Sequence, residues 1–335
     1  MALEYADSFD TYTAVQIVRR YPLSIGSISM STGVSGSGQC LYETNGFNAY
    51  LVVPVTQRNE YYGGCDIWAY SFGGGYGPLI DIRDISGTLI GTIGTAATGV
   101  VTTSWGNSST GVVVDSVWFN LVFHIVISAT VGVITVKIDG NTVINLTGQN
   151  TGSANIGSFR LCGANSAQEK YDNFWIFNTL GTHSNGFPIG RIAVQSLMPT
   201  ADGAYTDWIP NSGSNHYNRV SEAQADDDTT YNSTVTAGNK DSYGIDAISG
   251  SPAHIHGVIV TAITRKTDVN SKNYQVFSKS GATETYSPDI ATALTYASST
   301  QNGAASLLHT DDPNTGVEWT QANLNAIEVG AKVTL

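Results

Sequence analysis

The alternation of side chains over residues 121–146 constrains this chain more than any other feature of its sequence. Residues 133–138 alternate strictly between two faces, with Ile134, Val136 and Ile138 on one face and Val133, Thr135 and Lys137 on the other. A period of two is typical of a half-buried β-strand and does not fit a helix. Asp139 and Gly140 follow directly and favour the positive φ angles of a tight turn. The segment therefore predicts a meander of antiparallel strands.

Similar short strands are expected in both halves of the chain. Residues that alternate, or that are rich in β-branched and aromatic side chains, occupy 50–55, 67–72, 79–84, 89–93, 159–162 and 174–177, and then 191–197, 242–247, 256–265, 274–278 and 293–298. A helix is expected over 320–327, where Thr320 can cap the first turn and Leu324 and Ile327 share one face. The chain is therefore predicted to be all-β, with one short helix near its C-terminus.

The 335 residues suffice for two domains, each with its own core. Residues 178–190 consist mainly of turn-forming residues without any periodic pattern. Such a stretch is typical of a connection between two cores. We therefore expect a first domain over residues 1–178, a linker over 179–190 and a second domain over 191–335.

Charge and hydropathy exclude several classes of partner. With 15 basic and 27 acidic residues the net charge is −12, so the chain lacks the clustered cations that a nucleic-acid binder needs. Glu4, Asp7 and Asp10 stand where a signal peptide would carry a basic start and an apolar run. His124 and Ser128 interrupt the longest apolar stretch, which is too short for a membrane helix. No nucleic-acid partner, signal peptide or membrane insertion is expected.

Catalytic patterns are not recognisable in the sequence. A glycoside hydrolase needs two carboxylates at a defined separation, which on a strand means acids at positions i and i+2. The nearest approach is Asp81, whose partner on the same face is Arg83 and not an acid. The chain is therefore predicted not to be an enzyme, and a polysaccharide depolymerase is disfavoured.

Two groups of residues are candidates for ligand binding. Asp66, Trp68 and Tyr70 share a strand face and, with Tyr76, form an aromatic cluster that can stack against sugar rings, with Asp66 as hydrogen-bond acceptor. The alternative, which the sequence favours, is that these rings fill the sandwich core.

The second group consists of Asp226, Asp227 and Asp228, whose oxygens suit Ca²⁺. Consecutive acids point in alternating directions and lack the spacing of a calcium loop, so a solvated turn is favoured there. No other cofactor is expected.

The first half of the chain resembles the laminin-G or pentraxin type of domain. The resemblance is carried by Val117-Trp118-Phe119 at the start of an apolar strand and by Asp139-Gly140 after the next one. It implies that the N-terminal domain is a concanavalin A-like jelly-roll sandwich. The second domain is then expected to be a further antiparallel β-sandwich.

Other patterns resemble a family of virion structural proteins of tailed bacteriophages. The opening Asp7-Ser8-Phe9-Asp10-Thr11-Tyr12 is similar to a D-G-F-D-H-Y start, with Ser8 and Thr11 in place of the Gly and His. Further patterns in the same order are Asp202-Gly203-Ala204, Thr206-Asp207-Trp208 and Asp241 with Tyr243.

This resemblance implies a bacteriophage virion protein, in capsid decoration or in a tail or fibre, that is assembled in the host cytoplasm and contacts other virion proteins. Only 13% of the residues are charged, which favours self-association through uncharged surfaces, and the resemblance implies a homo-oligomer with trimeric symmetry. The alternative function is an adhesin that binds host surface glycans.

Overall fold

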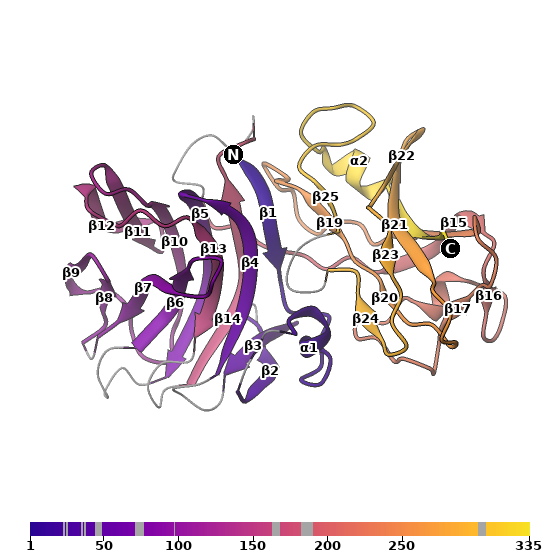
Figure 1. The fold of residues 1–335 in the computed structure, drawn as a ribbon, viewed down its shortest axis with the longest axis horizontal. Helices are drawn as coiled ribbons and strands as arrows, with labels where there is room; N and C mark the ends of the chain where they lie inside the picture. The colour runs from indigo at the N-terminus through magenta and orange to yellow at the C-terminus, as the bar shows by residue number, and fades with distance from the viewer. Residues whose placement is uncertain are drawn as a thin grey trace. The chain divides into compact units, whose positions relative to one another are not determined.

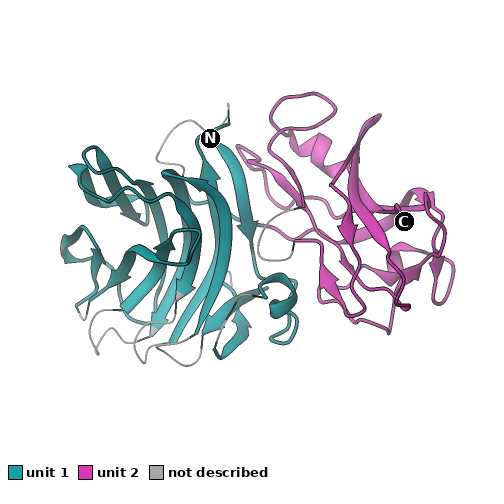
Figure 2. Cartoon of the chain, viewed as in Figure 1, with its two compact units in different colours: residues 1–194, 302–304 teal, residues 195–301, 305–335 magenta. Residues whose placement is uncertain are grey.

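The computed structural model describes residues 1–335 except 23, 25, 35, 37, 44–48, 71–76, 97, 163–167, 182–189 and 301–305. The described chain divides into two compact units, one built on Met1–Val194 and the other on Gln195–Gln301 and Ala305–Leu335 (Figure 2). The last strand of the first unit ends at Asn178, the end expected for the first domain. Residues 190–194 also belong to the first unit.

The larger sheet of the first unit has eight antiparallel strands in the order β12-β11-β10-β5-β14-β3-β2, with β1 also paired with β14 (Figure 1). Its strands are β1 (Ala2–Asp7), β2 (Ile28–Thr32), β3 (Gln39–Glu43), β5 (Glu60–Tyr70), β10 (Trp118–Val126), β11 (Gly132–Ile138), β12 (Asn141–Gln149) and β14 (Gln168–Asn178). The predicted hairpin is β11 and β12, in which Ile138 pairs with Asn141. Asp139 and Gly140 form its turn with φ angles of 48° and 82°, as expected.

The smaller sheet has six antiparallel strands in the order β4-β13-β6-β7-β8-β9. Its strands are β4 (Tyr50–Arg58), β6 (Gly77–Arg83), β7 (Leu89–Thr95), β8 (Val100–Thr103), β9 (Gly106–Gly111) and β13 (Ile156–Cys162). A short helix, α1 (Ile17–Arg20), follows β1 and was not expected from the sequence.

The two sheets share one hydrophobic core. Tyr61 of β5 and Phe123 of β10 each lie 5.6 Å, ring centre to ring centre, from Phe159 of the smaller sheet. The hydroxyl of Tyr171 on β14 donates to the carbonyl oxygen of Leu79 on β6 at 2.9 Å. All five residues are fully buried. The predicted antiparallel β-sandwich is therefore confirmed for the first unit.

The second unit contains a six-stranded antiparallel sheet in the order β15-β18-β26-β21-β22, with β23 paired with β21, and three two-stranded sheets. The six strands are β15 (Pro199–Thr206), β18 (Lys240–Ile245), β21 (Asn273–Ser280), β22 (Thr283–Tyr286), β23 (Ile290–Ala291) and β26 (Glu328–Val333). The two-stranded sheets are β16 (Ile209–Pro210) with β17 (Asn232–Ser233), β19 (Val258–Val260) with β25 (Leu307–His309), and β20 (Ile263–Thr264) with β24 (Ala297–Ser298). A 3₁₀ turn covers Tyr217–Arg219.

The predicted C-terminal helix is α2 (Gln321–Asn325), shorter than expected. The Thr320 hydroxyl caps it by accepting the backbone N–H of Asn323 at 3.1 Å. Leu324 and Ile327 are buried against Trp319, so the predicted face is the buried one. The all-β class with a short C-terminal helix is thus confirmed, and α1 is an additional short helix.

The strand expected over residues 191–197 does not form. This segment has no strand partner and precedes β15, which begins at Pro199. None of the helices in the described ranges is long and apolar enough to cross a membrane.

Candidate functional site

An aromatic row crosses the outer face of the eight-stranded sheet. Along β5, alternate residues such as Tyr61 and Ile67 belong to the core, so Tyr62, Asp66 and Trp68 project to the opposite face. The register then places four half-buried side chains directly opposite one another on neighbouring strands: Tyr42 on β3, Lys170 on β14, Trp68 on β5 and Trp118 on β10. We call these four residues the aromatic row.

This position corrects the interpretation that the sequence favoured. Trp68 and Tyr62 do not fill the core between the sheets, whereas Tyr61 does. Tyr70 belongs to β5, but its side chain, like the whole of Tyr76, lies outside the described residues. Of the predicted glycan-binding residues, the structure therefore brings Asp66 and Trp68 to the same outer face.

Lys170 lies between two rings of the aromatic row. Its ammonium nitrogen is 4.7 Å from the centre of the Trp68 ring and 5.6 Å from that of Tyr42. Both distances are within the range in which a cation is attracted by the π face of an aromatic ring. These contacts orient the two rings and the lysine with respect to one another.

Asp66 occupies the next position along β5 on the same face, but it is only 1% exposed. Its carboxylate accepts hydrogen bonds from the side-chain amides of Asn120 at 3.0 Å and Asn173 at 2.8 Å. It also pairs with Arg191, whose Nη2 lies 3.0 Å away and whose side chain is 56% exposed. The carboxylate that was predicted to accept hydrogen bonds from a sugar thus bonds to the protein itself, and it positions Asn120, Asn173 and Arg191.

The connection after β14 is fixed to the same face. Besides the bond from Arg191, the backbone N–H of Val194 donates to the side-chain oxygen of Asn173 at 2.8 Å. Asn173 has a φ of 50° at an irregularity in the pairing of β14 with β5. The left-handed backbone of Asn173 places its side chain between Asp66 and the segment 190–194.

An open depression of about 380 Å³ lies beside these groups. It is lined by Asn120, Val122, Lys137, Asp139, Gly140, Gly190 and Arg191. Asn120 is two residues from Trp118 on β10, on the same strand face. The aromatic row and the depression therefore belong to one surface, and Asp66 fixes the parts that join them.

Asp172 lies on the strand face that carries Lys170, opposite Asp66 in the register. Its carboxylate accepts the backbone N–H groups of Val34 at 2.9 Å and Asn173 at 2.7 Å. Burial raises the pKa of Asp172 to about 6, and the nearby charges of Asp10 and Asp66 act in the same direction. This carboxyl therefore changes its charge near neutral pH.

The predicted calcium ligands make other contacts. Asp226 accepts the backbone N–H and the hydroxyl of Thr230, both at 2.9 Å, while Asp228 pairs with Arg265. Asp227 between them has a φ of 60°, as in a turn. Across the described ranges no group of three or more acidic, histidine or cysteine side chains is arranged to hold a metal ion.

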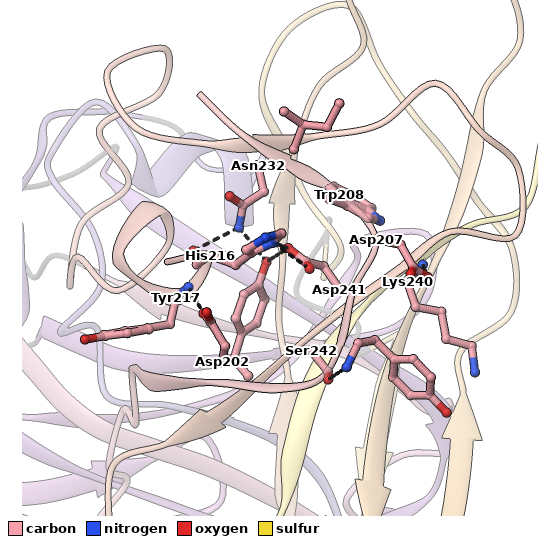
Figure 3. Close-up of polar contacts among 12 residues, drawn as sticks. Asp202, Asp207, Trp208, His216, Tyr217, Asn232, Lys240, Asp241 and Ser242 are labelled. Carbon is pink, nitrogen blue, oxygen red and sulfur yellow. Dashed lines mark hydrogen bonds and ion pairs between the residues drawn. The ribbon is translucent and has the colours of Figure 1, made fainter. Parts of the chain in front are cut away.

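A second polar cluster lies in the second unit (Figure 3). Asp241 on β18 is 1% exposed and accepts hydrogen bonds from Nδ1 of His216 at 2.9 Å and from the hydroxyl of Tyr243 at 2.7 Å. The side-chain amide of Asn232 donates to the Tyr243 hydroxyl and to the His216 carbonyl, both at 2.9 Å. Burial raises the pKa of Asp241.

This cluster joins the segment before β18 to β18 itself. His216 lies just before the 3₁₀ turn and Asn232 begins β17, while Asp202 on β15 accepts the backbone N–H of Tyr217 at 2.7 Å. No serine, threonine or cysteine of the described chain bonds to the histidine ring. The arrangement therefore stabilises the connection and does not by itself form a nucleophilic site.

Sequence reasoning missed Tyr42, Trp118 and Lys170 as members of the site. Each is on a different strand from Trp68, and the cross-strand register that brings them together is not visible in local patterns. The sequence feature that could have identified part of the site is Trp118, the first residue of the strand next to the predicted hairpin.

No protein-family model matches the sequence, and no curated protein matches it. Similar solved structures include a protein described as "Sialidase", with 13% identity and a TM-score of 0.40 over 53% of this chain and 19% of the other. Trypanosoma rangeli sialidase in complex with sialic acid has 13% identity and a TM-score of 0.38, over 52% of this chain and 30% of the other. A structure of botulinum neurotoxin type C, whose cell entry is described as dependent on two ganglioside molecules, has 11% identity and a TM-score of 0.35, over 46% of this chain and 42% of the other.

The chain spans less than half the length of each of these proteins. At such low identities and TM-scores these likenesses carry no argument about its function.

Proposed function

We propose that this chain is a carbohydrate-binding β-sandwich protein whose binding surface is the outer face of the eight-stranded sheet. The observation that carries the proposal is the aromatic row, in which Tyr42, Trp68 and Trp118 are half-buried on neighbouring strands and in register. A sugar ring has an apolar face that stacks against an aromatic ring, while its hydroxyl groups bond to polar neighbours.

The dimensions of the row suit an oligosaccharide. Adjacent strands are about 4.8 Å apart, so the three steps from β3 to β10 separate Tyr42 from Trp118 by about 14 Å. A surface of that length accommodates more than one sugar ring. The depression next to Trp118 adds the exposed guanidinium of Arg191 as a polar partner at one end.

The rings are held on a rigid scaffold. Tyr42, Trp68 and Trp118 project from strands whose inner-face side chains, such as Leu41 and Phe119, are buried in the core. Side chains with few rotatable bonds on a packed sheet lose little conformational entropy when a ligand binds. This favours recognition of an extended ligand by stacking.

The role as a virion component belongs to the same proposal and rests on the sequence patterns given above. A non-enzymatic, homo-oligomeric protein on a virion surface presents several copies of one weak sugar site, and multivalency then strengthens attachment. Trimeric assembly is part of this proposal, and mass photometry of the purified chain tests it directly.

The carbohydrate function is tested with the full chain on a glycan array, followed by titration of the bound glycans. Trp68→Ala and Trp118→Ala are expected to weaken binding by about tenfold each, because each removes one stacking surface. Tyr231→Ala is the matched control, since Tyr231 is an exposed ring in the second unit. Absence of saturable glycan binding, or unchanged affinity in folded Trp68→Ala and Trp118→Ala proteins, contradicts the proposal.

A further inference from the structure

The aromatic row contains a single formal charge, the ammonium group of Lys170. Within the described part of the chain this ammonium forms no ion pair, and it lies against the rings of Trp68 and Tyr42. Most lysines on a protein surface extend into water, whereas this one lies half-buried between two rings that are placed to stack against a ligand. Solubility alone does not explain why a lysine occupies this half-buried position between two rings.

The sign of this charge is opposite to that of the whole chain. The net charge is −12, so the protein as a whole repels anions. A cation in the centre of a ligand-binding row reverses that tendency locally. An ammonium group offers three hydrogen-bond donors and no acceptor, so the best partner for it is a carboxylate or another anionic group.

Among the described residues, the acidic side chains near the row bond to other groups and do not form ion pairs with the ammonium of Lys170. Asp66 is paired with Arg191, and Asp139 accepts the backbone N–H of Asn120 at 2.9 Å. The carboxylate of Asp172 is engaged by two backbone N–H groups. The depression at the end of the row is lined by two further cations, Lys137 and Arg191, together with the carboxylate of Asp139, and Arg191 is paired with Asp66.

We infer that the ligand is an acidic glycan, in which the ammonium of Lys170 binds the carboxylate of one sugar residue while neighbouring residues stack on Tyr42 and Trp68. This inference rests on the proposed function and adds the class of ligand to it. The spacing supports the assignment, because Lys170 stands one strand from Tyr42 on one side and one strand from Trp68 on the other. A ligand carboxylate that lies between two sugar rings, each stacked on an aromatic ring, has the same order.

The test uses the full chain and pairs of ligands that differ in charge alone. Oligosaccharides that contain uronic or sialic acids are each compared with their carboxyl-reduced forms, which keep the backbone and lose the anion. The wild-type protein is expected to bind the acidic form at least tenfold more tightly. Raising NaCl from about 50 to about 500 mM is expected to reduce that preference, because salt screens exposed charges.

Lys170→Gln keeps most of the side-chain length and removes the charge. We expect it to lower affinity for the acidic ligand about tenfold and to leave affinity for the reduced ligand unchanged. Lys272→Gln, a half-buried lysine in the second unit, is the control. An equal loss for both ligands means that Lys170 only positions the rings, and it overturns the inference.

The inference and the proposed function fail in different ways. Equal binding of acidic and reduced ligands, with loss in Trp68→Ala, overturns the acidic-glycan inference and leaves carbohydrate binding intact. Absence of binding to any glycan by the folded chain overturns both.

Discussion

Asp66→Asn is the substitution that tests most directly how the outer face is built. The carboxylate of Asp66 is 1% exposed and accepts hydrogen bonds from Asn120, Asn173 and Arg191. Asparagine has almost the same shape, but one of its two terminal groups is an N–H₂ donor. That donor would face an amide donor of Asn120 or Asn173, and the negative charge opposite Arg191 would be lost.

The expected loss of stability follows from these contacts. A hydrogen bond from a buried amide to a charged group contributes about 1.5–3 kcal/mol, and a buried donor without an acceptor is costly in itself. The Arg191 side chain is 56% exposed, so its pair with Asp66 is screened by solvent and contributes less than about 1 kcal/mol. Together these terms predict that Asp66→Asn lowers the free energy of unfolding of the first unit by about 2–4 kcal/mol.

Urea denaturation followed by circular dichroism and tryptophan fluorescence measures this loss. Asp289→Asn is the control, because Asp289 is exposed in the second unit. Since Asp66 also fixes Arg191, we expect faster proteolysis within residues 190–194 of the variant under native conditions. If Asp66→Asn unfolds at the same urea concentration as the wild-type chain, the buried carboxylate does not hold this face together and the reasoning is refuted.

Two further predictions concern stability. The folded-state pKa of Asp172 is about 6, above the ordinary value of an aspartate, so between these two values the native carboxyl keeps a proton that the unfolded chain releases. The stability that this bound proton contributes is therefore lost as the pH rises from about 4 to about 7. The difference in unfolding free energy between wild type and Asp172→Asn is expected to fall by up to about 3 kcal/mol across that range, and a difference independent of pH contradicts it. Gly63→Ala would place a Cβ atom 2.3 Å from Cζ of Phe123 and 2.6 Å from Cδ1 of Ile176, so it is expected to lower the free energy of unfolding by about 1–3 kcal/mol. Gly190→Ala, which has open space around the new Cβ atom, is expected to leave it unchanged in the same urea titration.

Local patterns predicted those parts of the fold that local physics determines. Alternation over residues 133–138 and the Asp139-Gly140 pair specified a hairpin, because side-chain period and turn conformation act over a few residues. Thr320 likewise predicted the start of α2 through a bond to the third residue of the same turn. The end of that helix depends on packing and was predicted less well.

The alternation of β5 predicted correctly that Asp66 and Trp68 share a face, but not which face. Tyr61 and Ile67 on one side are as apolar as Tyr62 and Trp68 on the other, so composition along β5 does not distinguish core from surface. That choice is made by the second sheet, whose Phe159 packs against Tyr61.

The strand expected over residues 191–197 failed for a related reason. Its side chains alternate, but no strand is available to pair with it. Instead Arg191 bonds to Asp66 and the backbone N–H of Val194 bonds to Asn173, while the side chain of Gln195 bonds to Ser249. Patterns over a few residues cannot reveal such partners.

The core face of β5 therefore determines folding stability and its outer face carries the proposed binding surface. Variants on the two faces are expected to affect these two properties differently. Gly63 lies against Phe123 and Ile176 on the core side, so its substitution should affect folding alone. Trp68 is half-buried on the outer side, as is Lys170 on the neighbouring β14, so their substitution should weaken binding more than folding. Asp66 is the exception, because it projects to the outer face yet is fully buried. A variant at Asp66 should therefore lose stability and ligand affinity together, and the ratio of the two losses measures how far the site depends on this single carboxylate.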